Sequence, residues 1–412
     1  MFFLKQKMSK YDIKKRHRLL LWKKTKYTLK SLFIKPKSLF VDFLTLENID
    51  TAYCTIRTVA KSPIKIRTYH PRRIAEDQSY METSTVKIEV FSLKNVMVTG
   101  NSSFFVAKNK SKLFYEKLHT DDRPIYIYED ENIELHSDSL ARIRNYDIKE
   151  YSDDAIFFGG IFTFNYYHFL IDILAKTQFL ESIPNSKSLK IVLDSSIKEN
   201  ENLKTVAQFF LKDYEVEYLE KGYFHAFKNL WFINNPNITV PNIMEGTIYE
   251  ADFTKISPAS IDYVRETCLA NYDIKKVNVK PVSKVFIARK SIFRKYNEDE
   301  LVDIAKIHGF EPVYFEDLNI HEQIFIMNNV DYIVGASGAA WTNLLFSKKN
   351  CKGLTWLGTV WGDFSVFSTL AKLVGFDLYH IRNESKTSNF HEDYTIDPQV
   401  FEEQLIQLLK IS

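Results

Sequence analysis

Glycine and cysteine are scarce in this sequence. Only 12 of its 412 residues are glycine, so a cluster of small residues stands out from the rest of the chain. The three cysteines, Cys54, Cys268 and Cys351, form no CxxC pair and no metal-binding spacing. An odd, sparse set of thiols indicates a reducing compartment without a disulfide framework, and free cysteines of this kind are usually buried.

Long apolar segments are also missing. No uncharged apolar span reaches about 18 residues, and the nearest candidate, residues 157–175, contains Asn165, His168 and Asp172. This stretch therefore predicts a buried helix and its approach. The apolar run Leu19–Trp22 is far shorter than the core of a secretory signal. We expect a cytoplasmic protein, or one that lies peripherally on the inner face of the cytoplasmic membrane.

Positive charge is concentrated in the N-terminal part of the chain. Residues 1–40 contain 13 Lys or Arg and one acidic residue, whereas the other residues contain 42 basic and 51 acidic ones. The body is therefore acidic, which argues against a nucleic-acid groove across it. The basic segment 1–37 also carries Leu and Trp side chains that partly follow helical spacing. It is either an interfacial helix that binds anionic lipid or a solubilising, disordered tail.

The order of apolar patterns predicts the fold class. Residues 38–151 alternate polar and apolar side chains, which is typical of antiparallel strands. Strand and helix patterns then alternate over 155–240, and again from residue 284 onward, as in parallel sheets with right-handed crossovers. We predict an α/β protein with a β-containing N-terminal region, divided into a basic segment 1–37, an N-terminal domain 38–270 and a C-terminal Rossmann-like domain 271–412.

The stretch "DYIVGASGAAWTNLLF" is a predicted strand, a loop of small residues at 336–340 and a predicted helix. Ligands of parallel α/β sheets lie outside the carboxyl ends of the strands. Small residues let a phosphate approach the free N–H groups at the start of the helix, and Ser337 adds a hydroxyl. The alternative is a tight turn that needs small residues for packing alone.

Two arginines follow the first strand of the C-terminal series. Arg289 ends that strand and Arg294 lies in the next loop, so both are expected near the same sheet edge. Two guanidinium groups there suit a diphosphate, although each is equally a solvated loop charge. Glu322 and Gln323 begin a later helix, where they either complement its dipole or bind a sugar hydroxyl.

A third candidate site lies in "FNYYHFLIDIL". His168 and Asp172 are four residues apart and share one helix face, with Asn165 about one turn earlier. A carboxylate next to an imidazole can orient it as a general base. The alternative is a satisfied core histidine beside a surface acid. The acidic runs "YEDENIE" and "TDDRP" are loops without metal-ligand spacing, and we predict no required divalent ion.

In their order, these stretches resemble glycosyltransferase family 61, which includes bacterial capsular and surface polysaccharide biosynthesis proteins. The resemblance covers about residues 155–380 and is carried by "NYYHFLID", "ARKSIFRKYNEDE", "HGFEPV", "HEQI" and "VGASGAAWTNLLF". Ser337 stands where many members carry a histidine, and "GLTWLG" lacks an acidic residue often found there. The role of that histidine is therefore not carried over, and His168 or Asp172 is the available base.

The resemblance implies a GT-B-like fold, with two Rossmann-like halves facing a cleft. It implies inverting, metal-independent transfer from a nucleotide sugar to a growing surface glycan such as capsule or lipopolysaccharide, without a further cofactor. The implied roles are His168 and Asp172 as the catalytic pair, Asn165 on the acceptor side, and donor binding by Arg289, Arg294, Glu322, Gln323, Ser337, Gly338, Ala339 and Asn343. The alternatives are a non-catalytic scaffold of a glycan-assembly complex and a nucleotide-binding regulator.

Overall fold

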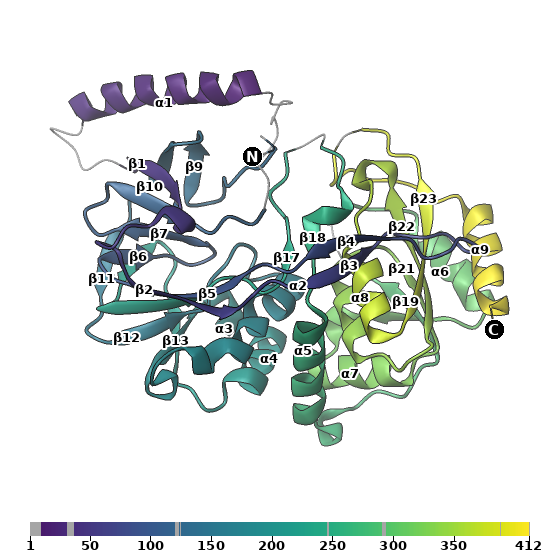
Figure 1. Ribbon diagram of the computed structural model, residues 1–412. Coiled ribbons are helices and arrows are strands. Elements are labelled where there is room, and N and C mark those ends of the chain that lie inside the picture. The colour runs from purple at the N-terminus through teal and green to yellow at the C-terminus, as the bar shows by residue number, and fades with distance from the viewer. Residues whose placement is uncertain are drawn as a thin grey trace. The chain divides into compact units, whose positions relative to one another are not determined.

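The computed structural model describes residues 10–30, 37–119, 123, 125–244, 247–290, 294–387 and 389–411 (Figure 1). Its contacts divide the chain into two compact units. The first unit consists of Met1–Pro63, Lys87–Pro236 and Val240–Met244, and the second of Ile64–Val86, Asn237–Thr239 and Glu245–Ser412. Each unit draws on separate stretches of sequence. The domain boundaries at 37/38 and 270/271 stay a prediction.

The first unit contains an eight-stranded sheet in the order β11-β15-β6-β7-β8-β1-β10-β9. Antiparallel pairing dominates, as predicted for this region, but β1–β8 and β11–β15 are parallel. The strands are β1 Ser38–Thr45, β6 Val96–Val98, β7 Phe104–Ala107, β8 Lys112–Tyr115, β9 Ile133–His136, β10 Leu140–Arg144, β11 Asp147–Glu150 and β15 Tyr223–Ala226. A 3-10 turn, Leu46–Asn48, follows β1.

The second sheet of this unit has the order β14-β13-β12-β16-β5-β2. Its strands are β2 Cys54–Lys61, β5 Ile88–Leu93, β12 Asp154–Phe157, β13 Lys190–Asp194, β14 Val216–Leu219 and β16 Asn229–Ile233. The pairs β12–β13, β12–β16 and β13–β14 are parallel, which confirms the predicted α/β layer, whereas β5 pairs antiparallel with β16 and with β2. Strand order reverses between β12 and β16, and ligands of open parallel sheets bind at such a switch point.

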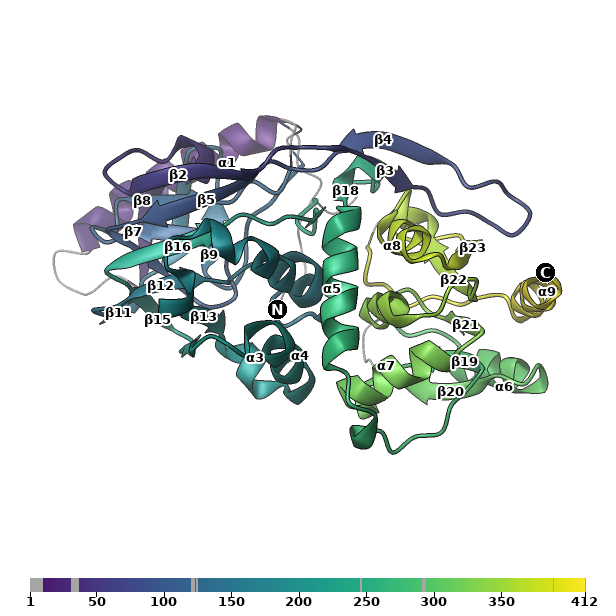
Figure 2. The ribbon, with the colours of Figure 1, turned by 60° about the horizontal axis from the view of Figure 1, so that its bottom comes forward.

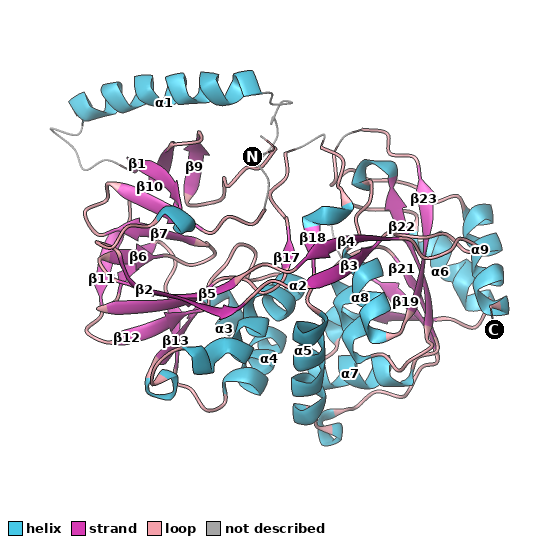
Figure 3. Ribbon diagram, viewed as in Figure 1, coloured by secondary structure: helices cyan, strands magenta, loops and turns pink. Residues whose placement is uncertain are grey.

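Helices cover this parallel layer, as the cyan segments of Figure 3 show. They are α2 Tyr166–His168, the π-helix Phe169–Ile173, the 3-10 segments Leu174–Ser182 and Ser186–Ser188, α3 Ser195–Glu199 and α4 Glu201–Leu211. Apolar side chains fill the core of the unit. The Phe105 ring of β7 lies 4.9 Å from that of Phe232 on β16 and 5.8 Å from that of Phe157 on β12, so the two sheets share one aromatic core.

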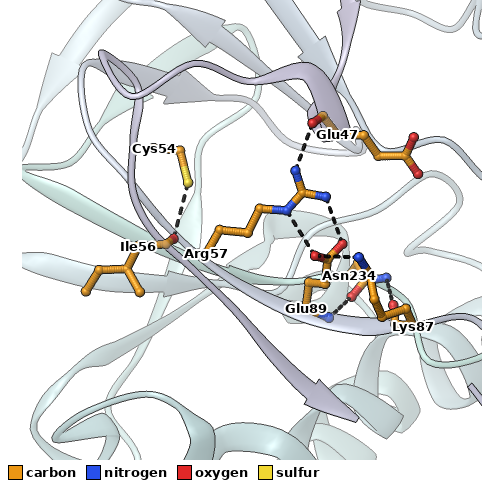
Figure 4. A network of polar contacts seen from close by, with 7 residues as sticks. All are labelled: Glu47, Cys54, Ile56, Arg57, Lys87, Glu89 and Asn234. Carbon is orange, nitrogen blue, oxygen red and sulfur yellow. Dashed lines mark hydrogen bonds and ion pairs between the residues drawn. The ribbon is translucent and has the colours of Figure 1, made fainter. Parts of the chain in front are cut away.

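A polar network joins β2 to β5 at the edge of the six-stranded sheet (Figure 4). Arg57 of β2 donates from Nε and Nη2 to the two carboxylate oxygens of Glu89, each at 3.0 Å, and its Nη1 donates to the Glu47 carbonyl at 2.8 Å. Lys87 also pairs with Glu89, at 3.0 Å. Burial alone would raise the pKa of Glu89, but hydrogen bonds from Arg57 and Lys87 outweigh it and lower the pKa.

Glu89→Gln therefore lowers the local stability of these strands. We expect the free energy of opening β2 and β5 to fall by about 1–3 kcal/mol at pH 7, because charge-assisted hydrogen bonds are lost. A lowered folded-state pKa means that this stabilisation is present above the ordinary value of 4.5 and is lost as the pH falls through the folded value. Hydrogen exchange in β2 and β5, measured at pH 7 and again at an acidic pH below the folded-state pKa of Glu89, gives the difference in the free energy of opening. The control is Glu150→Gln, which breaks an exposed pair with Lys108 and should have little effect.

The second unit is built on one five-stranded parallel sheet in the order β20-β19-β21-β22-β23. The strands are β19 Lys284–Ala288, β20 Glu311–Tyr314, β21 Tyr332–Gly335, β22 Lys352–Gly358 and β23 Asp377–Asn383. This confirms the parallel sheet predicted from the strand–helix repeats. In chain order it reads 2-1-3-4-5, the flavodoxin-like doubly wound order, whose switch point lies between the first and third strands.

Helices lie on both faces of this sheet (Figure 2). On one face α6 Glu298–Ile307 packs against α9 Pro398–Lys410. On the other, α5 Pro258–Asn271, α7 Ile320–Asn329 and α8 Val366–Val374 pack against the 3-10 helix η8 Ala339–Phe346. Helix α6 is followed by Gly309 (φ 82°), and the Asp397 side chain caps α9. Asn297 precedes α6, but its side chain bonds Ile396 instead of capping the helix.

The second unit also contains a hairpin whose sequence lies between β2 and β5. Its strands are β3 Lys65–Tyr69 and β4 Tyr80–Ser84. The backbone of Tyr69 bonds the hydroxyls of Thr369 and Ser368 on α8, at 2.9 and 2.6 Å. The His380 N–H on the edge strand β23 donates to the Arg72 carbonyl at 2.8 Å. The remaining short elements of the unit are β17 Ile238–Thr239, β18 Thr254–Lys255 and the 3-10 turns Ala251–Phe253, Ile274–Lys276, Phe315–Asp317 and Thr359–Trp361.

The basic segment contains helix α1, Lys10–Lys30, while residues 1–9 and 31–36 lie outside the described part. Leu20 is fully buried, Arg16 pairs with Glu129 at 2.7 Å, and His17 bonds Ser137 at 3.1 Å, so α1 packs on the first unit. Residues 10–30 of the segment are thus helical, and binding to anionic lipid stays a prediction. Among the helices described here, none is both long and apolar enough to cross a bilayer.

Candidate functional site

The His168–Asp172 pair follows the carboxyl end of β12, beside the switch point of the six-stranded sheet. The Asn165 side chain accepts the Tyr167 N–H at 3.0 Å and starts α2, which carries His168. The chain then widens into the π-helix that carries Asp172. Such π-helical turns often occur at functional sites. Sequence periodicity predicted one helix here, and no pattern indicated its change of type.

The pair has the geometry of an oriented base. His168 Nδ1 lies 2.7 Å from Asp172 Oδ2, and the two side chains are 14% and 9% exposed. His168 Nε2 has no hydrogen-bond partner among the described residues. Burial raises the pKa of Asp172, and the hydrogen bond and charge of His168 act against this rise. An Asp172 carboxylate that accepts from Nδ1–H leaves Nε2 as the proton acceptor.

The backbone is strained close to His168. Phe162 has a φ of 62°, which is rare for an aromatic residue, and its ring centroid lies 5.6 Å from that of His168. Its N–H donates to the Asn101 side chain at 3.2 Å, which helps to hold the turn. Strained residues of this kind gather at functional sites. The neighbouring Phe164 is 50% exposed, so an aromatic surface adjoins the pair.

Arg289 and Arg294 lie at the switch point of the second unit, after the carboxyl end of β19. The Arg289 guanidinium donates to the Arg294 carbonyl and, at 3.4 Å, to the Tyr394 hydroxyl. Arg294 reaches the Ser337 carbonyl at 3.4 Å after β21. Burial, followed by the nearby charge of Arg289, lowers the pKa of Arg294. Within the described ranges neither arginine pairs with a carboxylate, so together they can neutralise an anion.

Packing constrains the loop of small residues and the strand end that precedes it. A Cβ at Gly335 would lie 2.7 Å from the Ile287 Cβ, so β19 and β21 approach closely only with glycine here. Trp341 Nε1 donates to the Ala336 carbonyl at 3.0 Å, and this hydrogen bond joins the two ends of the loop. The helix that follows is a 3-10 helix beginning at Ala339. The loop also brings the Ser337 carbonyl to the Arg294 side chain, and phosphate binding by the loop stays a prediction.

A pocket opens beside Arg294 and Ser337 and encloses about 420 Å³ of empty space, part of it open solvent. The other lining residues come from the ends of β22 and β23 and from the loops after them: Trp356, Leu357, Gly358, Val360, Trp361, Asn383, Ser385, Asn389, Phe390, Glu392 and Tyr394. None of these was predicted. The carboxyl-end rule applied to β22 and β23 would have found Gly358 and Asn383, but nothing in the sequence marks the loop aromatics.

Glu322, Gln323 and Asn343 have internal partners. Glu322 completes the capping box of α7 with Asn319 and accepts the Asn278 N–H at 3.1 Å. Gln323 donates to two backbone carbonyls and accepts from Asn343 Nδ2 at 3.0 Å. All three are buried. The structure thus gives them roles in holding α7 and η8, and a direct role in donor binding stays a prediction, as it does for Gly338 and Ala339.

Residues 166–354 match the family model of glycosyltransferase 61. The chain carries a glycosyltransferase family 61 domain. No curated protein matches this chain. Among solved structures, a histidine-to-asparagine mutant of the flavo di-iron protein from Thermotoga maritima aligns with 84% of this chain and 99% of its own. That alignment has 12% identity and a TM-score of 0.23, which is too low to support any inference.

This domain makes the chain a glycosyltransferase, an enzyme that moves a sugar from a donor to an acceptor. The family 61 domain begins at α2 and ends within β22. It therefore includes His168, Asp172, Arg289, Arg294 and Ser337, and excludes the loop aromatics that complete the pocket. Within the described ranges, no group of three or more His, Cys, Asp or Glu side chains is arranged to hold a metal ion.

Proposed function

We propose that this glycosyltransferase moves a hexose or pentose from a nucleotide-sugar donor to a growing surface glycan, such as capsule or lipopolysaccharide, with inversion and without metal. The observation that carries the proposal is the His168–Asp172 pair within the family 61 domain. His168 Nε2 takes the proton of the acceptor hydroxyl as its oxygen attacks the anomeric carbon. The bond to the nucleoside diphosphate breaks in the same step, so that inversion results.

The leaving diphosphate is held in the second unit. What supports this placement is a pair of arginines at the switch point, next to a pocket with aromatic walls. Neither arginine pairs with a carboxylate in the part of the chain that the structure describes. Arg294 stabilises the negative charge that develops on the diphosphate, and Arg289 holds the backbone of Arg294. The ring of Trp361, 5.7 Å from the Arg294 guanidinium carbon, offers a surface for the rest of the donor.

A GT-B-like arrangement, in which two halves face one cleft, is part of this proposal. It is supported by the presence of a parallel sheet with its own switch point in each unit. His168 would then act from the first unit on a donor held by the second. A structure with bound donor and acceptor analogues tests this arrangement directly, and an acceptor far from His168 would contradict it.

The activity is tested by screening nucleotide sugars for nucleotide release that depends on a glycan acceptor. Transfer predicts release only when both substrates are present, together with an acceptor product enlarged by one sugar. A scaffold or a nucleotide-binding regulator would bind nucleotide without releasing it from any donor. Release that does not need an acceptor would identify a hydrolase and contradict the proposed transfer.

Peripheral membrane contact through α1 is a further part of the proposal. Lys14, Lys15 and Arg18 are exposed, whereas Arg16 and Leu20 attach the helix to the first unit. Changing the three exposed residues to Gln should weaken binding to anionic vesicles by about 3 kcal/mol, or on the order of 10²-fold, at low salt. Sedimentation with vesicles measures this. Gln at Lys198, Lys212 and Lys228 removes the same charge elsewhere, and equal losses in both triple variants would refute a specific role for α1.

A further inference from the structure

Behind the His168–Asp172 pair lies a lysine that the proposed reaction does not use. Lys176 is four residues beyond Asp172 and is fully buried, which is rare for lysine. Its Nζ lies 3.4 Å from the Gly159 carbonyl at the end of β12 and 4.6 Å from the centroid of the Phe232 ring. These contacts do not neutralise an ammonium group, so the buried charge requires anions nearby.

Two buried carboxylates supply the compensating charge. Asp172 is one of them, and its Oδ1 has no hydrogen-bond partner among the described residues. The other is Glu116, which directly follows β8 and is 4% exposed. Glu116 Oε1 accepts the Asn235 N–H at 2.6 Å, while its Oε2 is also left without a partner. Each carboxylate therefore has one oxygen that can interact with the ammonium through water.

Lys176, Glu116 and Asp172 act on one another electrostatically. Burial lowers the pKa of Lys176 to about 8, while the charges of Glu116 and Asp172 act to raise it. Burial raises the pKa of Glu116, the charge of Lys176 opposes this, and that of Asp172 adds to it. The charges of His168 and Lys176 act to lower the pKa of Asp172. A lysine with this pKa is still mainly protonated at neutral pH.

We propose that Lys176 and Glu116 are positioning residues that set the proton affinity of His168 through Asp172. With Asp172, Lys176 and Glu116 ionised, the cluster carries one net negative charge, and it becomes neutral when His168 accepts a proton. The negative charge of Glu116 therefore stabilises the His168 imidazolium that forms during transfer. The positive charge of Lys176 limits the stability of this imidazolium, so that the proton can leave again. The catalytic consequence of this coupling rests on the proposed function, whereas the electrostatic coupling itself does not.

The two residues predict shifts of opposite sign. Lys176→Met removes a positive charge and should raise the midpoint of His168 protonation by roughly one pH unit. Glu116→Gln removes a negative charge, keeps the shape of the side chain and its acceptor for Asn235, and should lower the midpoint by a similar amount. A purely structural role would not give opposite shifts from two buried substitutions. Lys190→Met is the control, since this half-buried lysine lies at the amino end of β13, on the opposite sheet edge from His168.

The test is an NMR titration of the His168 imidazole in the full chain, labelled at histidine and without substrate. Opposite shifts in the two variants, with no shift in the control, support the proposal. Unchanged midpoints, or shifts in the same direction, overturn it. If Lys176→Met does not fold, the downward shift in Glu116→Gln decides alone. The pH–rate profile is measured in parallel: NMR shifts that the profile does not follow would contradict His168 as the base and leave the coupling intact.

Discussion

Turnover in His168→Ala falls by roughly 10²–10⁴-fold, because the acceptor hydroxyl loses its general base. Donor affinity barely changes, since the donor is expected in the second unit and His168 belongs to the first. The limb of the pH–rate profile that reports imidazole titration disappears in this variant. Single-turnover measurements separate the chemical step from donor binding.

Asp172→Asn distinguishes two roles for the carboxylate. If Asp172 only orients the imidazole and stabilises its charged form, the loss is smaller than in His168→Ala. A loss as large as that of His168→Ala would make the carboxylate itself the base. The matched control is His308→Ala, which removes another imidazole paired with a carboxylate, that of Glu402 at 3.0 Å. Near-normal turnover in His168→Ala, with donor still bound, would mean that this histidine is structural.

Arg294→Ala weakens the binding of the nucleoside diphosphate by about 1.5–3 kcal/mol, or roughly 10–150-fold, because a buried charge-assisted hydrogen bond is lost. Arg289→Ala acts indirectly, since Arg289 bonds the Arg294 backbone and does not line the pocket. Calorimetry with a series of nucleoside diphosphates measures both effects. Lys290→Ala removes a neighbouring exposed charge that pairs with Asp317, and its affinity should stay unchanged. Normal affinity in both arginine variants would place the phosphate site elsewhere.

The parallel sheet of the second unit could be predicted because each strand and helix there has its own local pattern. The position of Arg289, Arg294 and Ser337 at one sheet edge followed from that prediction and from the rule that ligands bind at carboxyl ends. Their neighbours Trp361 and Tyr394 could not be predicted, because they come from irregular loops whose course depends on tertiary contacts.

Other features could not be predicted from the sequence, for specific physical reasons. From the sequence alone, Lys176 would be taken for a solvated charge on a helix. Only the fold shows that the charges of Asp172 and Glu116 act on it. Glu322 had two open interpretations from the sequence; the fold shows that its carboxylate completes the capping box with Asn319, and its role in donor binding stays a prediction. The hairpin β3–β4 follows β2 directly in sequence, so nothing local indicates that its partners, Thr369 and His380, come some 300 residues later.

That hairpin has a consequence for biosynthesis. Tyr69 leaves the ribosome 300 residues before Thr369, so at about 5–20 residues per second its docking surface is missing for about 15–60 s. During this interval the apolar Ile66 of β3, which the finished fold buries, is exposed. The nascent chain therefore needs protection until its last strand has been made. A release of the chain before β23 is translated would leave an aggregation-prone product, however well the first unit has folded.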